Sequence, residues 1–261
     1  MVYVRMEWHI WVLIGLQASA LAALSVLAYF VRARFNRIEH AARREARLAG
    51  LMAQESLDAV ALGALRFDFP VFFGGPAIRA SLARELVWQL VATRPRTIVE
   101  LGSGSSTILL AKVLQSLRIE GVRHVVIDHD ARFLEITRAN AQLNSVEGRI
   151  DFNLCPLGPV PSQSKPWYQG VEDLCRAVAP IDLLLVDGPP AFTPQDAGSR
   201  AAALPTCHQF LSRQALVIVD DADRSGEREM VRRWLSSFPD LERAGSGSQV
   251  GVDVLRRRAG E

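Results

Sequence analysis

Several common signals are absent from this sequence. Only three of its 261 residues are cysteines, Cys155, Cys175 and Cys207. They form no C-x-x-C pair and no zinc-type spacing, and an odd number cannot all pair within one chain. We therefore expect reduced, half-buried thiols in a reducing compartment. The formal net charge is only +2, so no overall positive excess indicates a nucleic-acid partner.

Charged side chains are also absent from a long N-terminal stretch. No Asp, Glu, Lys or Arg occurs between Trp8 and Val31. A helix over these residues would rise about 36 Å, more than the roughly 30 Å of membrane hydrocarbon. Arginines cluster directly after the stretch, whereas only Arg5 precedes it, and this asymmetry places the C-terminal side in the cytoplasm. We expect a single-pass membrane anchor over residues 1–31, with a cleaved signal peptide or a buried helix as alternatives.

A helix-favouring segment follows this anchor. Within residues 32–68, the part from Arg32 to Leu65 is rich in Ala, Arg, Glu and Leu and contains no proline. The composition predicts a helical juxtamembrane stalk that either continues the membrane helix or packs on the next domain. Its arginines either contact anionic lipid headgroups or form a solvated helix face.

From residue 69 onward, apolar strands alternate with helical segments. Near-continuous apolar strands separated by helices predict a parallel sheet covered on both faces. The last two strands lack a helix between them and predict an antiparallel hairpin with its turn at residues 245–248. Predicted strands cover residues 97–101, 124–128, 150–155, 181–186, 215–219, 241–244 and 250–255. Predicted helices cover residues 81–93, 107–117, 131–143, 171–178, 198–212 and 226–237.

A glycine turn follows the first predicted strand, in the sequence ELGSGSST at residues 100–107. Gly102 and Gly104 allow a sharp turn and let a ligand lie close to the backbone. A dinucleotide-binding loop would have a third glycine where Thr107 stands. Glu100 disfavours a diphosphate and suits a ligand with a cationic amino group. The P-loop pattern G-x-x-x-x-G-K-[ST] follows none of the strands.

Acidic residues end or follow several predicted strands. Asp128 ends the second strand, Asp187 follows the fourth, and Asp220 and Asp221 follow the fifth. In open α/β sheets, ligands bind beyond the carboxyl ends of the strands. Because these ends share one edge of a parallel sheet, we expect these four acids, together with Glu100 near the end of the first predicted strand, to converge there.

Together these motifs resemble the class I S-adenosylmethionine-dependent methyltransferases. E-x-G-x-G is similar to their motif one, VVIDHDARFLEITRANA to the post-motif segment, and IDLLLVDGPP to motif four. ALVIVDDADR resembles the fifth strand of a subgroup with E-x-G-S-G-x-S-T, D-G-P and D-D motifs. The resemblance covers about residues 69–255. It implies a Rossmann-like, seven-stranded, mostly parallel sheet with a C-terminal antiparallel hairpin, in a cofactor-binding domain of residues 69–261.

The resemblance also implies cofactor-binding roles for six residues. They are Glu100, Gly102, Ser103 and Gly104 around the methionine part of S-adenosylmethionine, Asp128 at the ribose hydroxyls, and Leu157 near the adenine. Purely structural roles remain open as alternatives: a turn for the glycines, a cap of the following helix for Asp128, and packing for Leu157.

Asp187, Asp220 and Asp221 are the candidate catalytic residues. In one interpretation they bind a divalent cation such as magnesium or manganese, which would lower the pKa of an acceptor hydroxyl. This resembles the metal-dependent catechol-type O-methyltransferases, although those carry Asp-Asn where this chain has Asp-Asp. In the other, Asp187 is a base or hydrogen-bond acceptor, and one of the other two caps the next helix. His129 and His208 are further candidate bases.

Two further pairs of residues allow more than one interpretation. Trp167 and Tyr168 lie in a Pro/Ser-rich loop over residues 156–170 that either forms a lid over the substrate or anchors itself in the core. Arg200 and Arg224 either bind an anionic substrate or, as we expect, are solvated.

The sequence as a whole predicts a membrane-anchored methyltransferase with a cytoplasmic catalytic domain. Clustered acids suit deprotonation of a hydroxyl, so we expect an oxygen acceptor, either a small molecule or a lipid or sugar near the membrane face. We expect no nucleic-acid partner. A nicotinamide oxidoreductase and a catalytically silent S-adenosylmethionine-binding scaffold are the alternatives.

Overall fold

The computed structural model describes residues 2–74, 77–160, 165–191, 196, 198–244 and 251–258, with side chains from residue 8 onward. The chain divides into two compact units, Met1–Ala53 and Gln54–Glu261. The sequence-predicted boundaries at residues 31 and 68 delimit functional segments rather than compact units, and they stay predictions.

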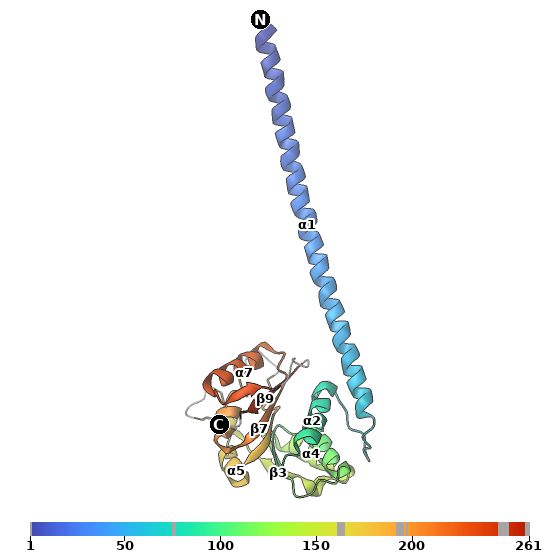
Figure 1. Ribbon diagram of the computed structural model, residues 1–261, viewed down its shortest axis with the longest axis vertical. Coiled ribbons are helices and arrows are strands. Elements are labelled where there is room, and N and C mark those ends of the chain that lie inside the picture. The colour runs from blue at the N-terminus through green and yellow to red at the C-terminus, as the bar shows by residue number, and fades with distance from the viewer. Residues whose placement is uncertain are drawn as a thin grey trace. The chain divides into compact units, whose positions relative to one another are not determined.

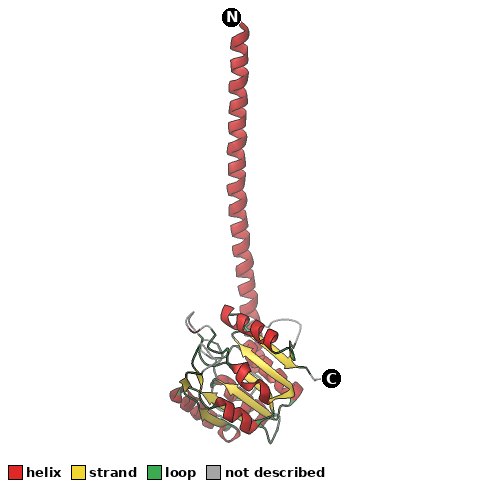
Figure 2. Ribbon diagram, turned by 90° about the vertical axis from the view of Figure 1, so that its left-hand side faces the viewer, coloured by secondary structure: helices red, strands yellow, loops and turns green. Residues whose placement is uncertain are grey.

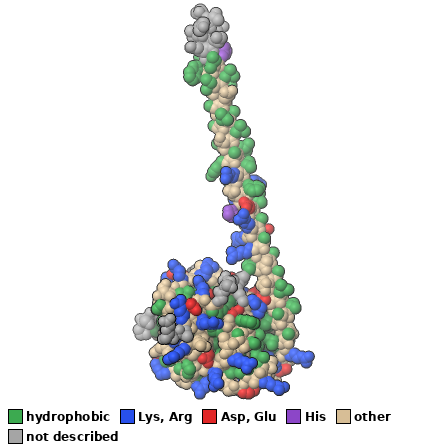
Figure 3. Space-filling view, viewed as in Figure 1, with side chains coloured by type: hydrophobic (Ala, Val, Ile, Leu, Met, Phe, Trp, Pro, Cys, Tyr) green, Lys and Arg blue, Asp and Glu red, His purple; other side chains and the backbone are tan. Residues whose placement is uncertain are grey.

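The first unit is part of one long helix, α1 (Val2–Leu62). Within the described residues, α1 is the one helix that is long and apolar enough to cross a membrane, and its most apolar window has a mean hydropathy of 2.1 with no buried residue. Figure 3 shows hydrophobic side chains along its N-terminal part and basic ones further along. The exposure of this window weighs against the buried-helix alternative. The helix runs through the predicted stalk and ends at Leu62.

The last turns of α1 belong to the second unit and contact helix α2 (Ala80–Thr93). Glu55 accepts a hydrogen bond of 2.9 Å from the backbone N–H of Ala80, and Asp58 forms an ion pair of 2.9 Å with Arg84. Arg79, the residue before α2, makes no capping hydrogen bond with its side chain. Glu55 therefore supplies the acceptor that the first turn of α2 needs.

The second unit is built on a seven-stranded sheet in the order β3-β2-β1-β6-β7-β9-β8 (Figures 1 and 2). All neighbours pair in parallel except β7 with β9 and β8 with β9, which are antiparallel. The predicted mostly parallel sheet with a late hairpin is confirmed. The hairpin joins the sheet through its second strand, and its predicted turn at 245–248 lies outside the described residues.

The strands of this sheet are β1 (Thr97–Leu101), β2 (Arg123–Asp128), β3 (Asp151–Leu154), β6 (Ile181–Val186), β7 (Leu211–Asp220), β8 (Leu241–Arg243) and β9 (Val252–Arg257). The remaining helices are α3 (Ser105–Ser116), α4 (Ala131–Leu143), α5 (Val171–Val178), α6 (Ala203–Cys207) and α7 (Ser225–Ser237). Short 3₁₀ turns cover Glu147–Arg149 and His208–Phe210.

Alternate residues of the central strands point to opposite faces of the sheet, as the two-residue period of a strand requires. Val99 packs under α5, α6 and α7, whereas its neighbour Ile98 packs under α2 and α3. Both side chains are fully buried. The near-continuous apolar strands follow from this three-layer arrangement, because both faces are covered.

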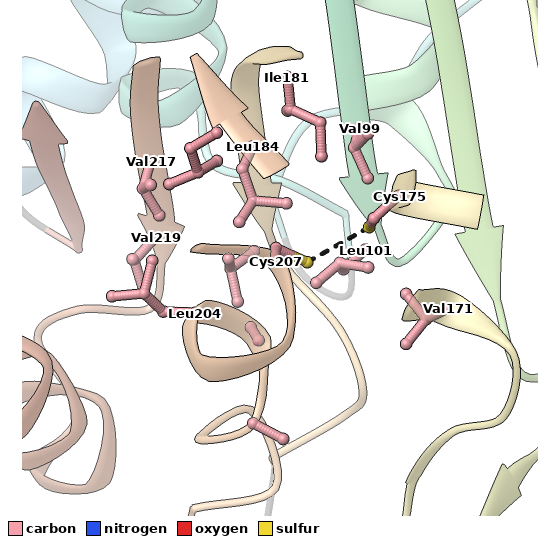
Figure 4. Packing of buried hydrophobic residues seen from close by; sticks show 14 of the residues in the cluster. Val99, Leu101, Val171, Cys175, Ile181, Leu184, Leu204, Cys207, Val217 and Val219 are labelled. Atoms are coloured by element: carbon pink, nitrogen blue, oxygen red, sulfur yellow. Dashed lines mark hydrogen bonds between the residues drawn. The ribbon is translucent and has the colours of Figure 1, made fainter. Parts of the chain in front are cut away.

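All three cysteines are free and buried inside the second unit. The sulfur atoms of Cys175 on α5 and Cys207 on α6 lie 3.5 Å apart (Figure 4). The thiols are free, and the expectation that they are only half-buried was wrong. Cys175 and Cys207 fill space between two helices and the sheet, as small apolar side chains do.

Two sequence-predicted segments differ from the structure. The predicted helix over 198–212 is reduced to α6 and a 3₁₀ turn, and β7 already begins at Leu211, which pairs with Ile181 across a register irregularity. The predicted loop over 156–170 contains an antiparallel ribbon of β4 (Leu157–Gly158) and β5 (Trp167–Tyr168). In both segments a long-range strand partner replaced the local preference.

The turns after β1 and β6 contact each other backbone to backbone. Gly102 has a φ of +95°, and a Cβ added there would lie 3.0 Å from the backbone N of Gly188. A Cβ added at Gly188 would lie 2.9 Å from the Cα of Gly102. Glycine is therefore required at both positions by space, and at Gly102 by backbone conformation as well.

We expect Gly102→Ala to lower the free energy of unfolding by about 1–3 kcal/mol, because alanine is strained at this φ and its methyl group meets Gly188. Chemical denaturation of the full-length chain in detergent measures the change. The matched control is Gly148→Ala, where an added Cβ meets no atom within 4 Å. Equal stability of the two variants would contradict the proposed constraint.

Candidate active site

The candidate site lies where the carboxyl ends of β1, β2 and β6 meet. The backbone N–H of Gly102 donates to the carbonyl of Ile127 at 2.8 Å, and that of Asp187 donates to the carbonyl of Leu101 at 2.9 Å. The hydrogen-bond ladders between these strands thus continue one residue beyond β1 and β6, and the three strands end at the same height in the sheet. The three loops that follow therefore begin side by side, as the sequence predicted for this edge.

Asp128 holds the glycine turn in place. Its Oδ2 accepts hydrogen bonds from the backbone N–H of Ser103 at 2.8 Å and from the Ser103 hydroxyl at 2.6 Å. Its Oδ1 accepts from the backbone N–H of Asp130 at 3.0 Å. The helix cap considered for Asp128 belongs to Asp130, whose side chain accepts from two N–H groups of the first turn of α4. The structure brings Asp128, Ser103 and Gly102 together, and their cofactor contacts stay predictions.

Glu100 lies beneath the turn rather than on its open side. Its side chain has no exposed surface. One carboxylate oxygen accepts from the Ser106 hydroxyl, and the other lies 3.1 Å from Nε2 of His124. Glu100 therefore ties the start of α3 to β2 through buried charge-assisted contacts. Its predicted contact with the methionine part of a cofactor stays a prediction, with both oxygens held by protein groups in this state. Gly104, by contrast, is half-buried at the start of α3 and leaves backbone accessible.

The β4–β5 ribbon covers another side of the same rim. Leu157 is half-buried on β4 and pairs with Tyr168 on β5. Trp167 and Tyr168 are each only 2% exposed and belong to the core cluster. The anchoring interpretation of these two residues is therefore confirmed. Leu157 follows β3 at the rim, so its proposed position near an adenine agrees with the chain path.

The phenol of Tyr168 reaches the crossing of the two glycine turns. A Cβ added at Gly188 would lie 2.3 Å from the Tyr168 hydroxyl oxygen. This oxygen is buried and has no hydrogen-bond partner among the described residues. Burial, followed by the negative charges of Asp128 and Asp187, raises the pKa of Tyr168 well above its usual value. A neutral, unpartnered hydroxyl at this point fits a polar ligand that lies along the glycine turn.

Asp187, Asp220 and Asp221 form one cluster, as the sequence predicted. Carboxylate oxygens from the three side chains lie within 4.8 Å of one another. Burial, then the charge of Asp220, raises the pKa of Asp187 well above its usual value. Burial, then the charge of Asp221, also raises the pKa of Asp220. Asp220 is only 5% exposed, whereas the side chain of Asp187 is 24% exposed. Two acids this close favour a shared proton.

Arg200 contacts all three members of this acidic cluster. Its Nη2 lies 3.4 Å from Asp187 Oδ1, and its Nη1 lies 3.4 Å from Asp221 Oδ2 and 3.2 Å from the backbone carbonyl of Asp220. Arg200 is only 2% exposed. The expectation that it is a solvated arginine was wrong, because solvated arginines lack such buried acidic partners.

Two more arginines approach the cluster from its outer side. Arg224 lies 2.9 Å and Arg79 lies 3.4 Å from Oδ1 of Asp221. Both oxygens of Asp221 therefore face guanidinium groups. Three carboxylates could hold magnesium or manganese by their chemistry, but here fixed positive charges already occupy several of their oxygens. The donor set does not fit a divalent cation in this arrangement.

The two candidate histidines lie in different places. Nδ1 of His129 is 3.2 Å from Asp128 Oδ1 at the rim. His208 precedes β7 and pairs with Asp240 at 3.0 Å. His208 lies just before the start of β7, whereas Asp220 is the last residue of this strand. His208 and the acidic cluster therefore lie at opposite ends of β7. The structure therefore does not bring His208 into the candidate site.

Sequence reasoning missed the part played by two residues. Arg200 precedes α6 in a segment predicted as helix, and no local pattern marks an arginine that will be buried. Tyr168 was singled out only as a loop aromatic. The sequence shows a glycine in each of the two turns, at Gly102 and Gly188. It does not show that Tyr168 reaches these turns, because this position depends on the pairing of β4 with β5.

Comparisons with known proteins agree with this geometry. Residues 99–222 match the family model described as a methyltransferase domain. No curated protein sequence matches the chain.

Solved structures share the fold at low sequence identity. A putative O-methyltransferase from Klebsiella pneumoniae has a TM-score of 0.55 and 17% identity, covering 78% of this chain and 97% of its own. The O-methyltransferase from Bacillus cereus in complex with S-adenosylhomocysteine has a TM-score of 0.51 and 17% identity, covering 80% and 91%. The Streptomyces achromogenes O-methyltransferase involved in tomaymycin synthesis, in complex with S-adenosylmethionine, has a TM-score of 0.51 and 19% identity, covering 79% and 89%.

The family model spans the strands that carry the glycine turn and the acidic cluster. The similar structures share the α/β fold of the second unit. Residues 99–222 therefore form a methyltransferase domain with this Rossmann-like fold.

Proposed function

We propose that this methyltransferase transfers the methyl group of S-adenosylmethionine to a hydroxyl oxygen. One observation carries the proposal: the glycine turn at Gly102 contacts the backbone of the turn that carries Asp187, so a donor on the first lies beside an acid on the second. The names of the similar structures, all three O-methyltransferases, support an oxygen acceptor.

The donor would lie along the turn between β1 and α3. The backbone from Gly102 to Gly104 is partly exposed there. The Tyr168 hydroxyl is buried at the crossing of the two glycine turns and has no hydrogen-bond partner among the described residues. Asp128 is the acid that ends β2 and fits the ribose hydroxyls, which would exchange with or add to its hydrogen bonds from Ser103. Leu157 offers an apolar contact for the adenine.

The Asp187–Asp220 pair would manage the proton of the acceptor. In the transfer, a lone pair of the acceptor oxygen attacks the methyl carbon, the carbon–sulfur bond breaks, and its electron pair stays on sulfur. The products are a methyl ether and the neutral thioether S-adenosylhomocysteine, and the hydroxyl proton passes to the carboxylate. A carboxylate whose pKa is raised is a stronger base than an ordinary one, which is why Asp187 suits this role.

The N-terminal helix supports a location at the cytoplasmic face of a membrane. The exposed apolar stretch from Trp8 to Val31 is long enough to cross a membrane. The arginines that follow it lie on the side that the positive-inside rule assigns to the cytoplasm. An acceptor at the bilayer surface, of lipid or sugar type, or a small molecule that partitions there, is consistent with such an anchor.

We expect the full-length chain in detergent to bind S-adenosylmethionine and S-adenosylhomocysteine, and not NAD, in calorimetry. Asp128→Asn should weaken binding by at least about tenfold, because a hydrogen bond to a charged group is worth about 1.5–3 kcal/mol. The matched control is Asp130→Asn, which changes the neighbouring acid that caps α4. Binding of NAD alone, or equal effects of the two variants, would refute the assignment.

The raised pKa of Asp187 predicts a stability that depends on pH. The unfolded carboxyl ionises near 3.8 and the folded one at higher pH, so the folded state binds more protons between these values. Its stabilising contribution is full below pH 3.8 and is lost as pH rises towards the folded pKa. Thermal unfolding across this pH range should show a midpoint temperature that falls as the pH rises, and Asp187→Asn should reduce this fall. An unchanged slope in the variant would rule out Asp187 as its source.

We expect the full-length chain to remain in the membrane fraction after washing with high salt or alkaline buffer. Salt would remove a chain held only by arginine contacts with lipid headgroups, whereas an inserted helix stays. Deletion of residues 1–31 should release the chain. Recovery of the intact chain in the soluble fraction without detergent would contradict the anchor, and loss of the N-terminal residues from the mature chain would indicate a signal peptide.

A further inference from the structure

We propose that Arg200 is the resident cation of the acidic cluster and takes the place that a divalent metal would have in a cluster of this composition. The proposal rests on the proposed function for the identity of the reaction. It makes methyl transfer by this chain independent of magnesium and manganese, with Arg200 as a positioning residue that acts through Asp187.

The guanidinium group is bound on all of its nitrogen atoms. Nε donates to the carbonyl of Pro189 at 3.1 Å, and Nη1 donates to the carbonyl of Asp220 at 3.2 Å. The carboxylates add contacts of 3.4 Å from Asp187 Oδ1 to Nη2 and from Asp221 Oδ2 to Nη1. These partners come from the loops after β6 and β7, so one buried side chain links both strand ends that carry the acids.

The same contacts account for the charge of the cluster. Three carboxylates within 4.8 Å repel one another unless positive charge or protons join them. Arg200 lies against Asp187 and Asp221, and Arg224 and Arg79 lie against the other oxygen of Asp221.

A divalent cation would have to displace this arrangement. Both oxygens of Asp221 and one oxygen of Asp187 face guanidinium groups, and an arginine does not give up its charge by deprotonation. A metal ion at the same acids would therefore lie beside a positive charge that is only 2% exposed. Asp220 Oδ1 is a buried cluster oxygen without a hydrogen-bond partner among the described residues, but an ion bound there would lie against the guanidinium that contacts Asp187 and Asp221.

Arg200 also differs from a metal in what it does for the reaction. It stays charged at every working pH, and its planar fork fixes direction as well as charge. Its contact with Asp187 Oδ1 fixes the side chain of the residue that precedes Gly188, whose backbone lies at the crossing of the two glycine turns. A lysine would keep the charge and lose the simultaneous contacts with both loops.

The test is a titration of Mn²⁺ followed by electron paramagnetic resonance, with the full-length chain in detergent. We expect the unchanged chain to bind no Mn²⁺ at the cluster. Arg200→Ala removes the resident charge and should increase Mn²⁺ affinity at least about tenfold. Arg200→Gln, which can keep a hydrogen bond to the Pro189 carbonyl, repeats the measurement if the alanine variant does not fold.

Two controls separate this effect from a general change of charge. Arg224→Ala removes a guanidinium from Asp221 but leaves Arg200 in place, and it should show no gain. Arg200→Lys keeps one positive charge and should also show none. A second substitution, Asp220→Asn, should abolish any Mn²⁺ binding that Arg200→Ala creates.

Binding of Mn²⁺ by the unchanged chain that is lost in Asp220→Asn would overturn the proposal. So would the absence of any gain in folded Arg200→Ala or Arg200→Gln. Calorimetry with S-adenosylmethionine on the same samples keeps the two proposals apart. A chain that binds neither ligand disproves the proposed function alone, whereas one that binds both Mn²⁺ and S-adenosylmethionine disproves only the role of Arg200.

Discussion

The level alignment of the parallel strands β2, β1 and β6 is the constraint on which the rest of the site depends. Ladder hydrogen bonds extend from Gly102 to Ile127 and from Asp187 to Leu101, so the following turns start at one height. Because Gly102 and Gly188 have no side chains, these turns approach to backbone contact. A larger residue at either position would separate the loop that carries the glycine turn from the loop that carries Asp187.

Burial makes the electrostatics of this edge consequential. Two like charges about 4 Å apart repel by roughly 4 kcal/mol near a protein surface, and the three acids after β6 and β7 lie within 4.8 Å. Arg200 lies against Asp187 and Asp221 and offsets part of this repulsion. Burial and the neighbouring acid raise the pKa values of Asp187 and Asp220, so these two acids take up a proton more readily than ordinary carboxyls. The guanidinium keeps the geometry fixed, which suits a site that must accept a proton.

The other acids of the rim show a different use of charge. Asp128 accepts hydrogen bonds from Ser103 with one oxygen and from the backbone of Asp130 with the other. Glu100 contacts Ser106 with one oxygen and His124 with the other. Both fix the glycine turn before any ligand arrives. A turn held in this way loses little conformational freedom on binding, which favours a preorganised donor site. The unpartnered hydroxyl of Tyr168 is the exception, and it points to the same turn.

The sequence by itself determined the strands, the glycine turn, the edge at which the acids gather, and the apolar N-terminal helix. Each of these follows from local periodicity, or from the rule that parallel strands end at one edge. Only the tertiary structure decided that Arg200 is buried, that Glu55 caps α2, that the 156–170 segment forms a ribbon, and that His208 lies at the far edge. These outcomes depend on contacts between residues distant in the chain, and an arginine or a histidine carries no local mark of the partner that it will meet.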